Sequence, residues 1–331
     1  MARHPAITLT AMKVGVFTVI LGSQNLEATL DYLASLGVQA VEFGAGGYAR
    51  SPHCPLEDLL ASEQKCRELR RAVESRGLSI SALNAAGNPI HPVREAATKF
   101  DADFRKVIQL ANTLEVGVVI NFSGCPGGAP GDKSPNWVTC PWPPDYLDIL
   151  DYQWNEVVIP YWQEVAPLLT ANGVKVGLEM HPGFVVYNPE TLLRLRTAVG
   201  DVIGANFDPS HLFWQGIDPC AAVRALQGAI WHCHAKDTAI HQWNAATNGT
   251  LDTKHYRDEL HRSWIFRTVG YGHPRHFWCD FVSTLRMCGY DGVLSMEHED
   301  SLMTPREGLE KGVSFLQSIV LGEAKGSVSW A

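Results

Sequence analysis

Eight short apolar runs recur along the chain, and each is followed by a segment with helical features. Runs rich in Val, Ile, Leu and Ala are typical of strands whose two faces are both covered. Strands that alternate with helices in this way predict a parallel sheet of the α/β class. The expected strands are residues 13–19, 39–43, 78–83, 116–122, 175–179, 202–208, 229–234 and 292–297. The expected helices include residues 63–76, 100–114, 154–171, 277–288 and 305–321.

Eight such units predict a (β/α)8 TIM barrel, and a doubly wound open sheet is the alternative. The barrel is favoured because no Gly-x-Gly-x-x-Gly motif follows the first strand and because polar residues follow strands 2 to 8, not one switch point. We expect one domain over residues 1–331, with residues 1–12 as an N-terminal extension and 322–331 as a C-terminal tail. Two long loops, residues 123–145 after strand 4 and 237–273 after strand 7, are expected to cover the barrel mouth.

Ionisable residues stand at the C-terminal ends of the last four expected strands. Glu179 ends the fifth strand, Asp208 the sixth, His234 the seventh and Glu297 the eighth. A parallel barrel brings these strand ends together around one mouth. Three carboxylates and one imidazole at this place would repel each other unless a divalent cation held them, so the four residues are predicted to bind a metal ion.

The four strand ends carry the motifs Gly-Leu-Glu-Met-His at 177–181, Asn-Phe-Asp-Pro-Ser-His at 206–211, His-Cys-His-Ala-Lys-Asp at 232–237 and Ser-Met-Glu-His-Glu-Asp at 295–300. In this order they resemble the xylose isomerase-like sugar-phosphate isomerase/epimerase superfamily, and the resemblance covers most of the chain. It implies one divalent ion, most often Mn²⁺ and alternatively Mg²⁺, Co²⁺ or Zn²⁺, bound by the four strand-end residues. The superfamily includes ketose epimerases, inosose isomerases and dehydratases, apurinic endonucleases and C-glycoside deglycosidase subunits.

This ligand set predicts proton abstraction next to a carbonyl group. A hydroxy-ketone that chelates the cation through adjacent oxygens has a more acidic intervening C–H bond and gives a stabilised enediolate. Glu179 and Glu297 come from separated strands, so one can remove a proton and the other return it on the opposite face, as a sugar isomerase or epimerase requires. The alternative is elimination of the aglycone from a 3-keto glycoside with His181 as the base. The Glu-x-His pattern and the long loops after strands 4 and 7 resemble the C-glycoside deglycosidase subunits.

Further residues near the expected mouth are predicted to contact the substrate. They are His211, Lys236, Asn88, His91, Trp142 and Arg267. Lys236 falls on the strand face of His234, although a surface ion pair between Lys236 and Asp237 is the alternative. His232 lies one strand period deeper than His234 and is interpreted as a hydrogen-bonded interior residue. Glu299 and Asp300 are interpreted as structural.

Composition narrows the classes of partner. A formal net charge of −8 disfavours nucleic acid and hence a repair endonuclease, for which Glu42 and His91 would be additional metal ligands. A non-catalytic sugar-binding protein remains an alternative.

The eight cysteines form no Cys-x-x-Cys pair, and the N-terminus has no signal-peptide pattern, so we expect a cytoplasmic protein without membrane contact. The expected partners are a sugar or glycoside substrate and further copies of the chain, or a small partner subunit.

Overall fold

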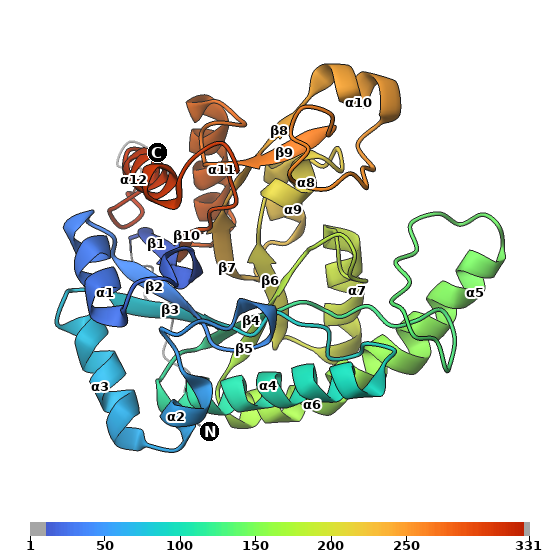
Figure 1. Ribbon diagram of the computed structural model, residues 1–331, viewed down its shortest axis with the longest axis horizontal. Coiled ribbons are helices and arrows are strands. Elements are labelled where there is room, and N and C mark those ends of the chain that lie inside the picture. The colour runs from blue at the N-terminus through green and yellow to red at the C-terminus, as the bar shows by residue number, and fades with distance from the viewer. Residues whose placement is uncertain (1–10, 328–331) are drawn as a thin grey trace.

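The structure is a computed structural model that describes residues 11–327. Parallel strands form a closed barrel, and helices surround it (Figure 1). Residues 1–10 and 328–331 lie outside the described residues, and with them most of the predicted N-terminal extension and the end of the predicted tail. The barrel strands are β1 (Lys13–Phe17), β2 (Ala40–Gly44), β3 (Ser79–Asn84), β4 (Val118–Asn121), β5 (Lys175–Glu179), β6 (Ile203–Phe207), β7 (Ile230–Ala235) and β10 (Val293–Met296).

Pairing between the first and the last strand closes the sheet. Val14 of β1 is in register with Leu294 of β10, and on the other side of β1 Val16 is in register with Val41 of β2. Each remaining strand pairs in parallel with its neighbours in the order β2-β3-β4-β5-β6-β7-β10. The predicted TIM barrel is therefore confirmed. A doubly wound sheet is excluded, since it would leave two strand edges open.

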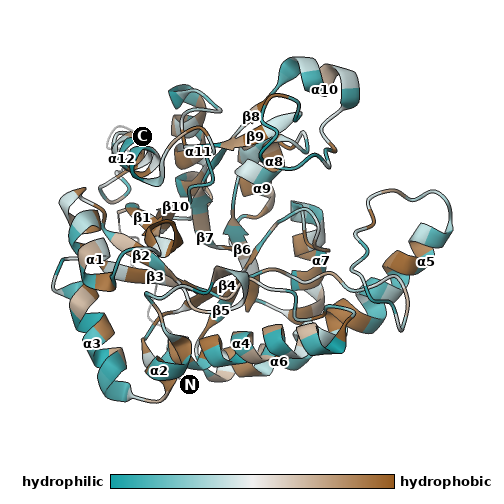
Figure 2. Ribbon diagram, in the orientation of Figure 1, coloured by the Kyte–Doolittle hydropathy of each residue, from teal (hydrophilic) through white to brown (hydrophobic). Residues whose placement is uncertain are grey.

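The helices cover the barrel with one apolar face and expose the other, which Figure 2 renders as alternating hydrophobic and hydrophilic colours along α1, α3 and α4. In α3, the buried residues Cys66, Leu69 and Val73 follow the spacing of one helical face. The helices are α1 (Leu26–Ser35), α2 (Leu56–Leu60), α3 (Glu63–Glu74), α4 (Arg94–Thr113), α5 (Asp145–Tyr152), α6 (Ile159–Ala171), α7 (Pro189–Val199), α8 (Ser210–Phe213), α9 (Pro219–Ala225), α10 (Gln242–Asn248), α11 (Arg275–Met287) and α12 (Pro305–Gln317).

Two sequence expectations about local structure were incomplete. The segment after β7 is not only a loop: β8 (Asp237–Ile240) and β9 (Trp264–Arg267) form an antiparallel pair that carries α10 at its tip. The helix expected from residue 154 begins at Asp145, and a π-helical turn over Gln153–Val158 joins α5 to α6. The apolar periodicity of the sequence identified only the half of this long helix that packs on the barrel.

The two long segments meet at the C-terminal end of the barrel. Trp137 of the segment after β4 packs against a cluster that contains Trp264 and Phe266 of β9. The ring of Phe266 lies 5.5 Å from the ring of His211, at the barrel mouth. This contact agrees with the prediction that both segments cover the mouth. Within residues 11–327, every helix is too short or too polar to span a bilayer.

Candidate metal centre and active site

The four strand-end residues converge at the mouth of the barrel. Glu179 is the last residue of β5, Asp208 directly follows β6, His234 lies in β7, and Glu297 directly follows β10. One potential ligand atom from each residue lies within 4.8 Å of those of the other three. Ser295 is in register with His234, so Glu297, two residues further, stands on the same face of the sheet.

The two oxygen atoms of the Asp208 carboxylate have different partners. Its Oδ1 atom accepts a hydrogen bond from the backbone N–H of Ser210 at 2.8 Å. Its Oδ2 atom is buried and accepts no hydrogen bond, although the Lys236 ammonium is within ion-pair distance at 3.1 Å. Because this buried carboxylate oxygen is paired with a cation and not with a backbone donor, it fits a role as a ligand to a metal ion.

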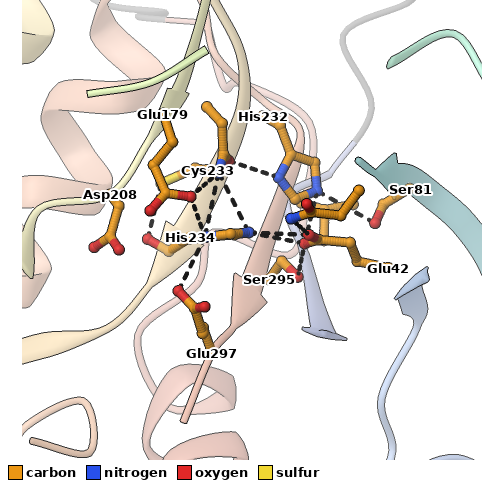
Figure 3. A network of polar contacts seen from close by, with 12 residues as sticks. Glu42, Ser81, Glu179, Asp208, His232, Cys233, His234, Ser295 and Glu297 are labelled. Atoms are coloured by element: carbon orange, nitrogen blue, oxygen red, sulfur yellow. Dashed lines mark hydrogen bonds and ion pairs between the residues drawn. The ribbon is translucent and has the colours of Figure 1, made fainter. Parts of the chain in front are cut away.

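A hydrogen bond to Glu42 of β2 fixes the ring of His234. Its Nε2 atom donates to Glu42 Oε2 at 2.9 Å, and its Nδ1 atom lies 3.2 Å from Glu297 Oε2 and 3.4 Å from Glu179 Oε2 (Figure 3). Metal-binding histidines commonly donate their second ring nitrogen to a carboxylate, which fixes the ring and its tautomer. The donor set of three carboxylates and one oriented imidazole therefore fits a divalent metal ion.

A buried polar network supports this site from inside the barrel. Asn206 of β6 donates through Nδ2 to Glu179 Oε2 at 3.1 Å and accepts through Oδ1 from His232 Nδ1 at 3.0 Å. The other ring nitrogen of His232 lies 3.3 Å from Ser81 Oγ. His232 is thus a hydrogen-bonded interior residue, as predicted. In Figure 3, His232 and Ser81 lie on the side of His234 that faces away from Asp208.

Lys236 places a positive charge inside the cluster. Its Nζ atom lies 2.7 Å from Glu297 Oε2, 2.9 Å from Glu299 Oε2 and 3.1 Å from Asp208 Oδ2, and its side chain is only 2% exposed. The ammonium also lies 4.7 Å from the ring centre of Phe266. Burial alone would lower the pKa of Lys236, but the carboxylates of Asp208, Glu297 and Glu299 outweigh it and hold the pKa well above its usual range.

The two glutamates of the cluster are ionised. Burial would raise the pKa of Glu179, but hydrogen bonds from His211 and His234 hold it well below its usual range. Burial would likewise raise the pKa of Glu297, but the charges of Lys236 and His234 lower it to about 2. Burial opposes the charge of His234, yet Glu42 and Glu297 hold its pKa well above the usual range. Metal binding at His234 would therefore release a proton.

Two further histidines stand beside Glu179. His211 Nε2 lies 3.1 Å from Glu179 Oε1 and 3.4 Å from Asp208 Oδ2, which brings this predicted substrate contact into the cluster. The rings of His181 and His211 are 4.1 Å apart. Burial lowers the pKa of His181 to about 3, so its imidazole is neutral at neutral pH. Its Nδ1 atom donates to the Pro182 carbonyl at 2.6 Å, which leaves Nε2 as a free acceptor.

In the described part of the chain, the other four predicted substrate contacts form no hydrogen bond or ion pair with the four strand-end residues. Asn88 uses its side-chain amide on the backbone of Cys125, donating at 2.9 Å and accepting at 3.0 Å, and so joins the loops after β3 and β4. His91 lines a cavity of about 480 Å³ whose wall contains none of the four candidate ligands. Trp142 is 72% exposed. Arg267 donates to Asp300 Oδ2 at 3.1 Å. Substrate contact by these residues stays a prediction.

The proposed surface ion pair between Lys236 and Asp237 was wrong. Both residues are buried, and Asp237 turns away to accept hydrogen bonds from the backbone N–H groups of Gly270, Gly272 and His273. These hydrogen bonds connect residues 270–273, which follow β9, to the start of β8 beside the barrel. Asp300 is structural, as predicted, because it accepts from the backbone N–H groups of Thr268 and Leu302.

Residues 30–319 match the family described as xylose isomerase-like TIM barrel. The chain belongs to this family. Over 312 residues it is 42% identical to the uncharacterized protein YfiH of Bacillus subtilis (strain 168), and the match covers 93% of this chain and 99% of that protein.

Solved structures of other proteins share the fold of this chain. A crystal structure of the IOLI protein with a bound zinc atom has a TM-score of 0.65 and 17% identity, covering 93% of this chain and 98% of its own. A D-tagatose 3-epimerase-like protein has a TM-score of 0.61 and 21% identity, again covering 93% of this chain and 98% of its own.

Three residues around the site were not identified as site residues from the sequence. Glu42 was considered only as a direct ligand for an endonuclease, whereas it contacts His234. Asn206 and Phe266 carried no prediction. The sequence feature that could have identified Glu42 and Asn206 is a charged or amide residue within an otherwise apolar strand. Phe266 belongs to the β8–β9 pair, which the sequence did not reveal.

Proposed function

We propose that the protein is a divalent-metal-dependent sugar isomerase or epimerase that acts next to a carbonyl group. The observation that carries this proposal is the convergence of Glu179, Asp208, His234 and Glu297 within 4.8 Å, with a buried Asp208 oxygen that accepts no hydrogen bond. These four residues would hold the ion, for which Mn²⁺ is the first candidate. The bound zinc atom of the structurally similar IOLI protein is consistent with a divalent ion in this fold.

A bound divalent ion would polarise the carbonyl and hydroxyl oxygens of a keto-sugar. Glu179 and Glu297 are both ionised, and they come from β5 and β10, which are not neighbours in the barrel. The ionised carboxylate of one can therefore take a proton from a carbon next to the carbonyl, and the other can deliver a proton to the opposite face once it has taken one up from water. His211 contacts Glu179 and orients this carboxylate.

A lyase that eliminates the aglycone of a 3-keto glycoside is the second candidate. The observation that favours it is the geometry of His181, whose Nδ1 atom donates to the Pro182 carbonyl and so leaves Nε2 as the proton acceptor. Elimination needs one base and a leaving group, so it would use His181 without a second proton donor on the opposite face. A phosphodiesterase with several metal ions is less well supported. Glu42 lies close enough to His232 and His234 to share an ion, but His91, the other additional ligand it would require, lines a separate cavity.

The test is a screen of ketoses, inososes and 3-keto glycosides with Mn²⁺-reconstituted protein in heavy water. Proton abstraction next to a carbonyl predicts incorporation of deuterium at the α carbon, and loss of activity with a chelator. Epimerisation conserves the molecular formula, whereas elimination releases the aglycone. Metal analysis accompanies the screen: less than about half an equivalent of bound ion after reconstitution would favour a non-catalytic sugar-binding protein. Turnover without exchange and without metal dependence would overturn both catalytic proposals.

A further inference from the structure

Lys236 contacts the same oxygen atoms that a metal ion would use. Asp208 Oδ1 is occupied by the Ser210 backbone, so Oδ2 is the oxygen available to a cation, and the Lys236 ammonium lies 3.1 Å from it. Glu297 Oε2, which faces His234 Nδ1 at 3.2 Å, is also the oxygen that Lys236 contacts at 2.7 Å. A carboxylate oxygen shared by an ammonium group is a weaker ligand, because both cations draw on the same negative charge.

Glu299 offers the ammonium another partner. Its Oε2 atom lies 2.9 Å from Lys236 Nζ, its side chain is 48% exposed, and it is not among the four clustered ligand residues. The flexible four-carbon stem of lysine permits a shift of its head group by a few bond rotations. Movement toward Glu299 would leave Asp208 and Glu297 to a divalent ion while the ammonium stays paired.

The charges of the cluster agree with such an exchange. Glu179, Asp208 and Glu297 bring three negative charges into a buried site, and Lys236 is the only lysine or arginine in ion-pair contact with any of them among the residues that the structure describes. Without a counter-charge, three buried carboxylates would strongly destabilise the fold. Lys236 thus stabilises the folded barrel by the same contacts that oppose metal binding.

We propose that Lys236 is a built-in competitor for the metal ion, and that it moves from Asp208 and Glu297 toward Glu299 when a divalent ion binds. This inference rests on the proposed function, because it requires that the four strand-end residues bind a metal. It makes metal affinity a compromise: Lys236 keeps the barrel folded without metal and lowers its affinity for the ion. Glu299 sets the balance by holding the displaced ammonium.

The test is titration of the metal-free, full-length protein with Mn²⁺ in a calorimeter. Lys236→Met removes the competing charge and should tighten binding by about tenfold or more. Glu299→Gln removes the alternative partner and should weaken binding severalfold. In the double variant the effect of Glu299→Gln should vanish, because no ammonium remains to be displaced. The matched control is Lys175→Met, at the opposite end of β5, where the ammonium lies over Trp231, and it should bind Mn²⁺ like the wild type.

Thermal unfolding gives a second readout. Metal-free Lys236→Met should melt below the wild type and recover with excess Mn²⁺, whereas Lys175→Met should not share this metal dependence. If Lys236→Met does not fold, Lys236→Gln replaces it, since glutamine keeps hydrogen-bond donors for the carboxylates. Unchanged or weaker Mn²⁺ binding by the neutral variants would overturn the inference. So would an equal effect of Glu299→Gln with and without Lys236, which would mean that Glu299 acts only through its own charge. A wild type that binds no divalent ion would overturn the proposed function as well.

Discussion

His234 and Glu42 are joined across the barrel by a hydrogen bond of 2.9 Å between buried atoms, although 192 positions separate them in the sequence. Glu42 is itself fixed by Asn84 Nδ2 at 2.9 Å and Ser295 Oγ at 2.8 Å. The orientation of the His234 ring is therefore set by β2, β3 and β10 together. This arrangement leaves Nδ1 directed at Glu179 and Glu297, where a ligand nitrogen is needed.

Glu42→Gln is expected to weaken divalent-metal binding by about 10- to 100-fold without unfolding the barrel, as is usual when the carboxylate behind a ligand histidine is lost. Glutamine keeps the shape of the side chain but cannot accept the His234 proton at both oxygens. Calorimetric titration with Mn²⁺ measures the change. Glu164→Gln, which removes a surface partner of Arg105, is the control and should bind as the wild type does. Equal affinity of Glu42→Gln and wild type would contradict the orienting role.

Asp208→Asn is expected to remove most of the bound metal while the protein stays folded. The residue lies at the mouth, and stability in this fold resides mainly in the core and the opposite face. Metal content by elemental analysis and unfolding by circular dichroism check both parts. Asp237→Asn is the contrasting variant: it should keep the metal but lose more than about 2 kcal/mol of stability, since three backbone N–H groups donate to its charge. Unfolding of Asp208→Asn would indicate a structural site instead.

Much of the barrel and the four strand-end residues were predictable because both depend on local patterns. An apolar run predicts a buried strand, and the residue that ends it must stand at the mouth once the strands are parallel. Glu179 and Asp208 follow from this rule alone.

The remaining features depend on contacts between distant residues. Glu42 is visible in the sequence as a charge within an apolar strand, but nothing local identifies His234 as its partner. The β8–β9 pair consists of two four-residue strands separated by more than twenty residues, too short to be recognised before they pair. Lys236 was assigned to the correct face, whereas its contact with Glu299 depends on the conformation of the loop after β10.

The folded protein should lose stability as the pH falls from about 6.5 to about 4. Burial lowers the pKa of His232 to about 4, against an ordinary value of 6.5. In this window the unfolded chain binds a proton that the folded chain does not, so this histidine costs about 1.4 kcal/mol of stability per pH unit. His232→Gln should flatten the dependence measured by urea unfolding. Above pH 7, the free energy of unfolding should depend on pH in the same way in the wild type and in His232→Gln. The same dependence in both proteins below pH 6.5 would contradict the assignment to His232.

His181→Ala separates the two proposed reactions. His181 is not one of the four strand-end ligands, although its ring nitrogen forms a second group of possible ligand atoms with Glu179 and His211. If the four strand-end residues bind the ion, the variant should bind Mn²⁺ like the wild type. If Glu179 and Glu297 exchange the proton, deuterium incorporation into the substrate should persist within about tenfold of the wild-type rate, as expected for a residue outside the proton transfer.

The opposite result has a different meaning. If His181 is the base of an elimination, exchange and aglycone release should fall by about 100-fold or more in His181→Ala, a typical contribution of general-base catalysis, with the metal retained. His181→Gln is the companion variant, since it keeps polar contacts beside His211 but cannot take up a proton. Loss of exchange in the alanine variant alone would therefore indicate a packing defect. Loss of exchange in both variants at saturating Mn²⁺ would show that Glu179 and Glu297 do not suffice for proton transfer, and would favour the lyase.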